Sequence, residues 1–339
     1  MLEWAAKPSV ALLCLIPKEG RKDSSILKVM EEKIKNLPVM RLNCNVTDFL
    51  SAINTIDIRT AIQKGLKNEI IFAEDYDGKP VNALCTEDGQ VYLSPNFAQA
   101  VWNMCYAGLK LADHTLSTEE CISEGSTLDS VYKSILESGC SLPECLYIKG
   151  VVEAMDWEPM LDMAKAFRRK WAIKKDFETL NAIDICGAFE SRVNGMYMCG
   201  MGGILLHEIT YFFNDHYERK TFESRRDLEQ EADDVAFEAL MAQSPAYRRT
   251  GVLGCLCAYL LAFFTNKDLI ENEAYYREDV RLFRQFDKVK DEDCKRRANV
   301  IVAYVLSQWL KEEHEKEIAV EHNREEKAVE LIREELKMV

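Results

Sequence analysis

The chain has 339 residues and a formal net charge of −14, and apolar residues make up 47% of it. That apolar share is enough for a substantial core in one large domain or two modest ones, so it disfavours extensive disorder. The acidic balance disfavours a general nucleic-acid-binding protein, which needs a basic face to meet phosphates. We therefore expect a soluble globular protein that does not bind nucleic acid.

The twelve cysteines are scattered among apolar neighbours, as in SVALLCLI and GVLGCLCAYLL. The sequence does not open with a basic segment, an apolar run and a small-residue cleavage site, so we expect no secretion signal. These two features predict buried, reduced thiols and a cytoplasmic location. The longest apolar run, residues 252–264, is shorter than the about 20 residues that cross a bilayer, which predicts a core helix and no membrane association.

The first half of the sequence mixes strand and helix patterns. Strands are predicted at residues 10–16, 68–73 and 88–95, and helices at residues 24–37 and 96–112. Asp-Gly turns in YDGKP and EDGQ separate the later strands and predict a small antiparallel strand element. Asn96, directly behind Pro95, is the expected N-cap of the second helix.

After about residue 150, nearly all of the sequence has helical apolar spacing. The predicted helices cover residues 156–171, 176–198, 203–217, 228–242 and 252–264, a segment around 282–286, and one or two charged, solvated helices over 297–338. The polar stretch 113–145, with one predicted helix at 127–136, is the best boundary candidate. We therefore predict a mostly helical α+β protein with a mixed α/β region, 1–145, and a helical region, 146–339. One compact domain is the alternative.

The segment GILLHEITYFFNDH begins like a zinc-peptidase motif, with His207 followed by Glu208. In such HExxH motifs two histidines four residues apart share one helix face and bind one metal ion, while the glutamate takes a proton from metal-bound water. Here Tyr211 stands where the second histidine belongs. A phenolate can bind zinc, but the ordinary pKa of tyrosine is about 10 and its side chain is longer than that of histidine.

A second segment, DLEQEADDVAFEALM, contains the other half of a two-helix metal cleft. Its E-x-x-A-D pattern begins at Glu229, which is the expected third metal ligand. Asp233 can accept a hydrogen bond from the second ring nitrogen of a ligand histidine and so fix its tautomer. Glu231 is the rival ligand.

His216 lies nine residues beyond His207. On an unbroken helix that spacing is half a turn out of phase, so the side chain points away from the site. It can return only if the chain bends at residues 214–215. We predict instead that His216 is a helix-end residue, which the negative C-terminal dipole favours.

Together the two segments resemble the Lit-type phage-exclusion peptidases, peptidase family U49. The resemblance is concentrated in residues 203–241, and VYLSPNFAQAVW and the helix around Arg281 are compatible with it. It implies a zincin-like, gluzincin-type zinc endopeptidase of the cytoplasm, with Glu208 catalytic and His207 and Glu229 binding zinc. Family members cleave a host translation elongation factor when a phage product signals infection, so such a protein substrate and a phage-derived activator are implied here.

Tyr211 departs from the family pattern and leaves several interpretations open. The chain is an active zinc peptidase in which Tyr211 or water completes the metal shell, or a pseudo-peptidase that binds a partner. A third possibility is that Tyr211 is an inactivating replacement of histidine, which a single base change produces. The simplest alternative has no metal, only a buried helix in which His207 bonds to an acid such as Glu229.

Overall fold

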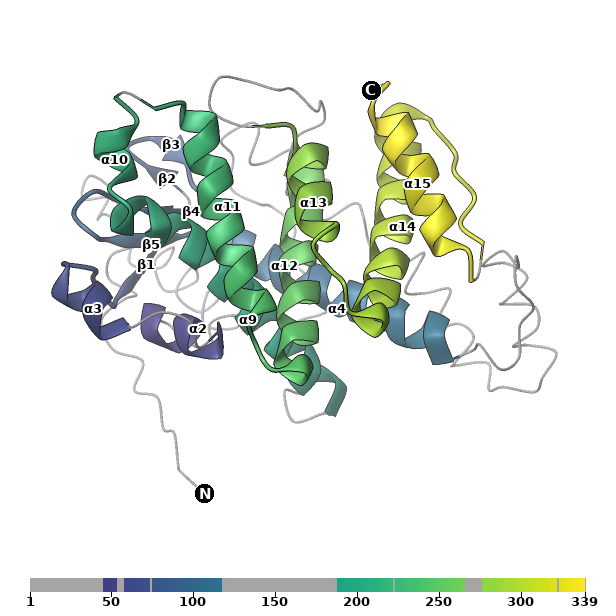
Figure 1. Cartoon of the computed structure of the whole chain (residues 1–339), viewed down its shortest axis with the longest axis horizontal. Helices are drawn as coiled ribbons and strands as arrows, with labels where there is room; N and C mark the ends of the chain where they lie inside the picture. The colour runs from purple at the N-terminus through teal and green to yellow at the C-terminus, as the bar shows by residue number, and fades with distance from the viewer. Residues whose placement is uncertain are drawn as a thin grey trace, which may run out of the picture.

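The computed structural model describes residues 45–53, 58–73, 75–117, 188–221, 223–265, 276–321 and 323–338. The strand predicted at 10–16, the helices predicted at 24–37, 127–136 and 156–171, and the predicted boundary near 145 lie outside these residues. Within the described part, small strands gather at one end of the molecule and long helices build the rest (Figure 1). This arrangement confirms the predicted α+β class with a mostly helical architecture.

The strands form a three-stranded sheet and a two-stranded ribbon. They are β1 (Ile70–Phe72), β2 (Asp75–Tyr76), β3 (Lys79–Pro80), β4 (Ala83–Cys85) and β5 (Val91–Leu93). In the sheet, β5 lies between β1, to which it is parallel, and β4, to which it is antiparallel. The β2–β3 ribbon reverses the chain once and the turn before β5 reverses it again, so β5 runs in the direction of β1. The expected antiparallel element is therefore a mixed sheet.

Ten helices are defined in the described residues. They are α2 (Val46–Ile53), α3 (Ile58–Gln63), α4 (Pro95–Ser117), α9 (Ala188–Phe213), α10 (His216–Arg219), α11 (Arg225–Met241), α12 (Pro245–Thr265), α13 (Glu278–Phe286), α14 (Glu292–His314) and α15 (Glu325–Leu336). The long α9 packs against α2, α4, α11, α12 and β4. One hydrophobic core joins the sheet and these helices, so described segments from both predicted regions pack together.

Helix α4 begins two residues earlier than it would with Asn96 as its N-cap. The hydroxyl of Ser94 accepts a hydrogen bond from the backbone N–H of Phe97 at 3.0 Å, and Pro95 is the first helical residue. Proline suits that position because its φ is already helical and the N–H it lacks would have no partner in the first turn. The prediction of Asn96 as N-cap is therefore wrong, and Ser94 caps the helix.

Glycines inside α9 and α12 let these two helices cross in backbone contact. A Cβ on Gly254 would lie 2.1 Å from the carbonyl oxygen of Met196, and one on Gly200 would lie 2.5 Å from the backbone of Gly254. A Cβ on Gly202 would lie 2.8 Å from the carbonyl oxygen of Phe49 on α2, so α9 and α2 also approach each other closely. From sequence alone, the glycine-rich GMGG at residues 200–203 favours a tight entry turn before the motif helix. The structure shows that this interpretation is wrong, because these glycines lie inside the continuous α9, where close packing requires them.

Helix α14 is a core helix and not the solvated helix expected near the C-terminus. Every residue from 300 to 306 is buried, and Trp309 and Leu310 are fully buried after them. The shorter α15 packs its own apolar residues, including Ile332 and Leu336, against this part of the molecule. The predicted segment 297–338 joins the apolar run ANVIVAYVLSQWL to a highly charged stretch, so the segment as a whole looks solvated although its first half is apolar.

Two further predictions concern thiols and membranes. The six cysteines in the described residues are all buried and free: Cys85, Cys105, Cys199, Cys255, Cys257 and Cys294. Their state confirms the predicted buried, reduced thiols for this part of the chain. Residues 252–264 lie within the buried α12, as predicted. Among the helices that the structure describes, none combines the length and apolarity of a membrane span.

The α9–α12 crossing predicts a large difference between two glycine substitutions. Gly254→Ala is expected to lower the free energy of unfolding by about 1–3 kcal/mol, because the added methyl group would overlap backbone atoms. Gly195→Ala is the matched control, since its Cβ would lie 3.5 Å from Thr250 Cγ2, an ordinary contact. That variant is expected to be neutral or stabilised. Urea denaturation followed by circular dichroism measures both, and equal stability of the two variants would contradict the close crossing.

Candidate active site

Helices α9 and α11 bring the two motif segments face to face. His207 on α9 places its Nε2 atom 3.2 Å from Oε2 of Glu229 on α11. Ala232 and Ala236, both buried on α11, are small enough to let the two helices approach. The structure thus brings together two of the residues predicted to bind metal.

The other ring nitrogen of His207 faces Asp233. Its Nδ1 atom lies 2.9 Å from Oδ1 of Asp233, which is ion-pair distance, but the two atoms are not in hydrogen-bond geometry, so the residues meet as expected without the expected hydrogen bond. Asp233 also accepts two hydrogen bonds from Arg281 on α13, both at 2.8 Å, and one from the hydroxyl of Tyr259 on α12, at 2.9 Å. The imidazole ring is therefore held between carboxylates on both sides.

Glu208 and Tyr211 lie beside this pair. Oε1 of Glu208 lies 3.9 Å from Nε2 of His207. The side chain of Glu208 is 22% exposed, against 6% for Glu229 and 4% for Asp233, so Glu208 is the carboxylate of the site most open to solvent. Tyr211 is buried, and its ring centre lies 6.1 Å from that of His207.

The buried charges shift the pKa values of their neighbours. Burial opposes protonation of His207, but the close carboxylate of Asp233, followed by Glu229 and Glu208, raises its pKa to about 10. Burial raises the pKa of Glu208 to about 7, against the opposing charge of His207. Burial also acts to raise the pKa of Glu229, but His207 and then a hydrogen bond from Tyr211 hold it below its usual range. A carboxyl group that titrates near neutral pH is suited to proton transfer.

Three carboxylates surround His207. When they are ionised, Glu208, Glu229 and Asp233 contribute −3; Arg281 contributes +1, and Arg225, whose Nε lies 3.7 Å from Oε1 of Glu229, contributes another +1. A protonated His207, which its raised pKa favours in the metal-free protein, balances the remaining −1. A metal ion bound to His207 would displace that proton and take over its charge.

The donor atoms also suit zinc in part. Zinc accepts imidazole nitrogen and carboxylate oxygen at about 2.0–2.1 Å, and two such ligands of a tetrahedral ion lie about 3.3 Å apart. The 3.2 Å between His207 Nε2 and Glu229 Oε2 is close to that value. Within the described ranges, however, no three His, Cys, Asp or Glu side chains are grouped so as to hold a metal ion. Tyr211 is the remaining predicted protein ligand.

The chain does bend after the motif helix, and His216 folds back toward it. Asp215 has a left-handed backbone conformation with φ of 53°, and α10 begins at the next residue. His216 is fully buried, its ring centre is 4.8 Å from that of Tyr211, and its Nε2 lies 3.3 Å from Oε1 of Glu231. The predicted helix-end position pointing away from the site is wrong, because the left-handed turn reverses the chain direction.

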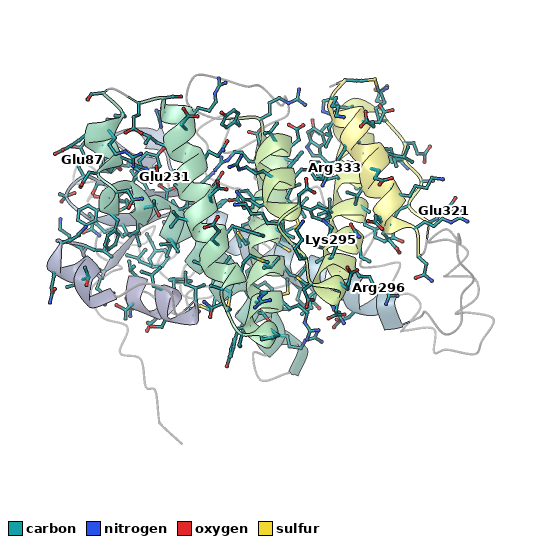
Figure 2. The ribbon with its side chains drawn as sticks, viewed as in Figure 1. Glu87, Glu231, Lys295, Arg296, Glu321 and Arg333 are labelled. Carbon is teal, nitrogen blue, oxygen red and sulfur yellow. The ribbon has the colours of Figure 1, made fainter. Side chains whose placement is uncertain are left out.

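The carboxylate of Glu231 already has several partners. Arg219 donates to Oε2 at 2.8 Å and Asn214 donates to Oε1 at 2.8 Å. The hydrogen bond from Arg219 is the largest of the effects that lower the pKa of Glu231 to about 2. Figure 2 shows Glu231 and Glu87 at the α10 end of the molecule. The structure therefore gives Glu231 a role in anchoring α10 to α11.

The sequence did not reveal two contacts that complete the surroundings of the site. Tyr259 bonds to Asp233, and the hydroxyl of Tyr217 donates to the carbonyl oxygen of Cys85 on β4. The second contact ties the sheet to the end of the motif helix. Neither contact has a local sequence signal, because each joins segments far apart in the chain. Arg281 attracted notice only through the family resemblance.

Comparison with protein-family models decides the family. The model described as Peptidase U49 matches residues 91–303, which is well over half of the chain and includes both motif segments and Arg281. The chain belongs to the peptidase U49 family. No curated protein and no solved structure matches it. Membership of U49 makes peptide-bond cleavage the reaction to which this site is assigned.

In this U49 peptidase, the contacts of Glu231 predict a pH-dependent contribution to stability. Glu231→Gln is expected to lower the free energy of unfolding at pH 7 by up to about 1 kcal/mol, since a side chain one-third exposed is screened by water. The folded-state pKa is lowered from 4.5 to about 2, so the contribution is fully present above pH 4.5 and is lost as the pH falls toward 2. Urea denaturation should show a smaller difference in the free energy of unfolding between wild type and variant at pH 3 than at pH 7.

The matched control for this prediction is Glu223→Gln. Glu223 contacts the same guanidinium of Arg219 and is as exposed as Glu231, at 36% against 34%, but only Glu231 of the two also accepts a hydrogen bond from Asn214. The control is therefore expected to lose less stability at pH 7 than Glu231→Gln. A difference between wild type and Glu231→Gln that is the same at both pH values would contradict the prediction.

Proposed function

We propose that this protein is a zinc-dependent endopeptidase. One observation carries the proposal: His207 Nε2 and Glu229 Oε2 meet at 3.2 Å in a buried, carboxylate-rich cluster of a peptidase-family chain. His207 and Glu229 would hold the ion, and Tyr211 or water would complete its shell. Zinc at this position supplies a Lewis acid and lowers the pKa of bound water to about 7.

Glu208 is the proton-transfer group in this proposal. It is the most exposed carboxylate of the cluster and lies 3.9 Å from His207 Nε2. With a pKa of about 7, it can take a proton from the attacking water and return it to the amine nitrogen that leaves the cleaved peptide bond. Asp233 orients the imidazole through Nδ1, so that Nε2 faces Glu229.

The outer edge of β4 supports an extended protein chain as substrate. The backbone hydrogen bonds of the β4–β5 hairpin join residues 86 to 90 and 94 to 82. Because hydrogen-bonded pairs alternate in an antiparallel ladder, Leu84 also directs its backbone groups toward β5. Ala83 and Cys85 then direct theirs to the opposite side, where no strand lies among the described residues; Cys85 is buried there and its carbonyl oxygen accepts from Tyr217, so Ala83 is the position at which a chain could add. An extended peptide can add to such an edge through main-chain hydrogen bonds.

This edge lies close to the candidate active site. The carbonyl oxygen of Cys85 accepts a hydrogen bond from Tyr217, near the end of the motif helix. Burial, followed by the charge of Glu208, raises the pKa of the Cys85 thiol to about 12, which shows that this strand and the site interact. A peptide paired with Ala83 would therefore run past Glu208.

The metal proposal predicts the behaviour of two substitutions. Wild type is expected to bind zinc, and Tyr211→His to bind one zinc ion per chain more tightly, because imidazole replaces a weakly acidic phenol. Glu208→Gln is expected to retain the zinc content and to lower kcat by at least about 100-fold, the usual contribution of a proton-transfer group. Elemental analysis and cleavage of a mixed peptide library measure these effects. If neither wild type nor Tyr211→His binds zinc, the proposal fails.

The edge-strand proposal predicts the effect of removing one donor. Ala83→Pro deletes an outward-facing N–H and is expected to lower kcat/KM for a library peptide roughly 2–10-fold, as the loss of one hydrogen bond does. Proline is tolerated at strand edges, so the fold should persist. Ala83→Ser retains the N–H and is the control. Unchanged kcat/KM in a folded Ala83→Pro protein would contradict this binding mode.

The biological substrate we propose is a translation elongation factor, cleaved during phage exclusion. Family membership alone supports this choice. Purified protein added to a translation extract, with and without phage proteins, is expected to produce one discrete cleavage of the elongation factor. The same extract treated with the Glu208→Gln variant should leave that factor intact.

A second candidate function is that of a pseudo-peptidase which binds a partner protein. Tyr211 at the position of a motif histidine favours it, as does the absence of a three-residue metal group among the described residues. It predicts no zinc and no cleavage in wild type, with both appearing in Tyr211→His. An inactivating replacement at this position predicts the same outcome.

A further inference from the structure

We propose that Arg281 on α13 is a positioning residue of the active site. Together with Tyr259, it holds the carboxylate of Asp233 against His207 and so fixes the direction of Nε2. This inference deepens the proposed function and rests on it for its consequence in metal binding. The contact geometry itself can be tested without metal or activity.

The first step is the rigid hold on Asp233. Arg281 donates from Nε to Oδ2 and from Nη2 to Oδ1, both at 2.8 Å, so the two groups form a forked pair. The side chain of Asp233 is 4% exposed and that of Arg281 is 23% exposed. A forked arginine–carboxylate pair fixes the plane of the carboxylate as well as its distance. Asp233 therefore cannot rotate while Arg281 stays in place.

The second step passes from Asp233 to the imidazole ring. Oδ1 is the shared atom: it accepts from Arg281 and from the hydroxyl of Tyr259, and it lies 2.9 Å from Nδ1 of His207. With Nδ1 fixed there, Nε2 faces Glu229 at 3.2 Å. Without Arg281, the Asp233 carboxylate would lose its forked partner and be free to turn, and His207 would turn with it.

A neighbouring pair on the same helices separates this role from helix packing. Asp234 and Arg284 join α11 to α13 at 2.7 and 3.2 Å, and Gln285 and Lys288 also donate to Asp234. Figure 1 shows α11 and α13 side by side. Arg284 donates to Asp234 and not to Asp233, and its side chain is 43% exposed. Arg284→Gln therefore weakens the connection between the helices while the forked pair of Arg281 and Asp233 stays in place.

The first experiment uses metal-free protein with 15N-labelled histidine rings, and His207→Gln assigns the signal. Wild type is expected to show a slowly exchanging, downfield Nδ1 proton on His207. In Arg281→Gln that proton should be lost or should exchange at least about tenfold faster, while Arg284→Gln should match wild type. Because zinc and proteolysis play no part, a failure of the proposed function leaves this result valid.

The second experiment measures zinc affinity by chelator competition. Arg281→Gln is expected to weaken zinc binding by about 10–100-fold, the usual effect of losing the partner that orients a ligand. Arg281→Lys restores the charge but not the fork and should lie between that variant and wild type. Arg284→Gln should change zinc affinity less than about twofold.

Two outcomes would overturn the inference. One is a wild-type His207 Nδ1 proton signal in folded Arg281→Gln protein. The other is an equal loss of that signal and of zinc affinity in Arg281→Gln and Arg284→Gln, because Arg281 would then only connect the two helices. If Arg281→Gln does not fold, Arg281→Lys and Tyr259→Phe decide instead. Tyr259→Phe removes one donor to Oδ1 and is expected to speed the exchange of the His207 proton. If the exchange rate is unchanged in both Arg281→Lys and Tyr259→Phe, the proposal is wrong.

Discussion

The rest of the structure depends on the backbone contact between α9 and α12. Gly254 lies so close to Met196 that even a methyl group has no space between the helices. The crossing fixes the path of α9, which then continues without a break to His207. It also fixes α12, whose Tyr259 meets Asp233 about one and a half turns beyond Gly254. A steric constraint in the middle of the helix pair thus determines the geometry at the site.

At the site itself, burial and charge oppose each other. Burial disfavours every ion in the cluster, yet His207 lies among three carboxylates, with Arg281 bound to Asp233 and Arg225 close to Glu229. These carboxylates hold a proton on His207, and a metal ion would compete with that proton. Tyr211 changes the donor atoms that a cation would contact, because a phenol stands where the family motif has a second imidazole, and this phenol is one of the groups that lower the pKa of Glu229.

The sequence predicted the motif helices and the meeting of His207 with Glu229 and Asp233. It could do so because the spacing of histidine and carboxylate residues along each helix is visible within a short segment. It failed where the deciding contact is distant. The glycines of GMGG look like a turn until Gly254 is placed against them. The reversal at Asp215 depends on a single left-handed residue that no periodicity reveals. The donors to Asp233 come from α12 and α13, so no pattern within α11 could identify them.

The glycine crossing also bears on how related chains could be recognised. An active peptidase and a partner-binding descendant need the same helix crossing, whereas only the active one needs the complete metal motif. Loss of a motif histidine therefore need not be accompanied by a change at Gly200 or Gly254. A search for divergent relatives that uses the spacing of these glycines would find members that lack the complete metal motif. A search based on catalytic residues alone would miss them.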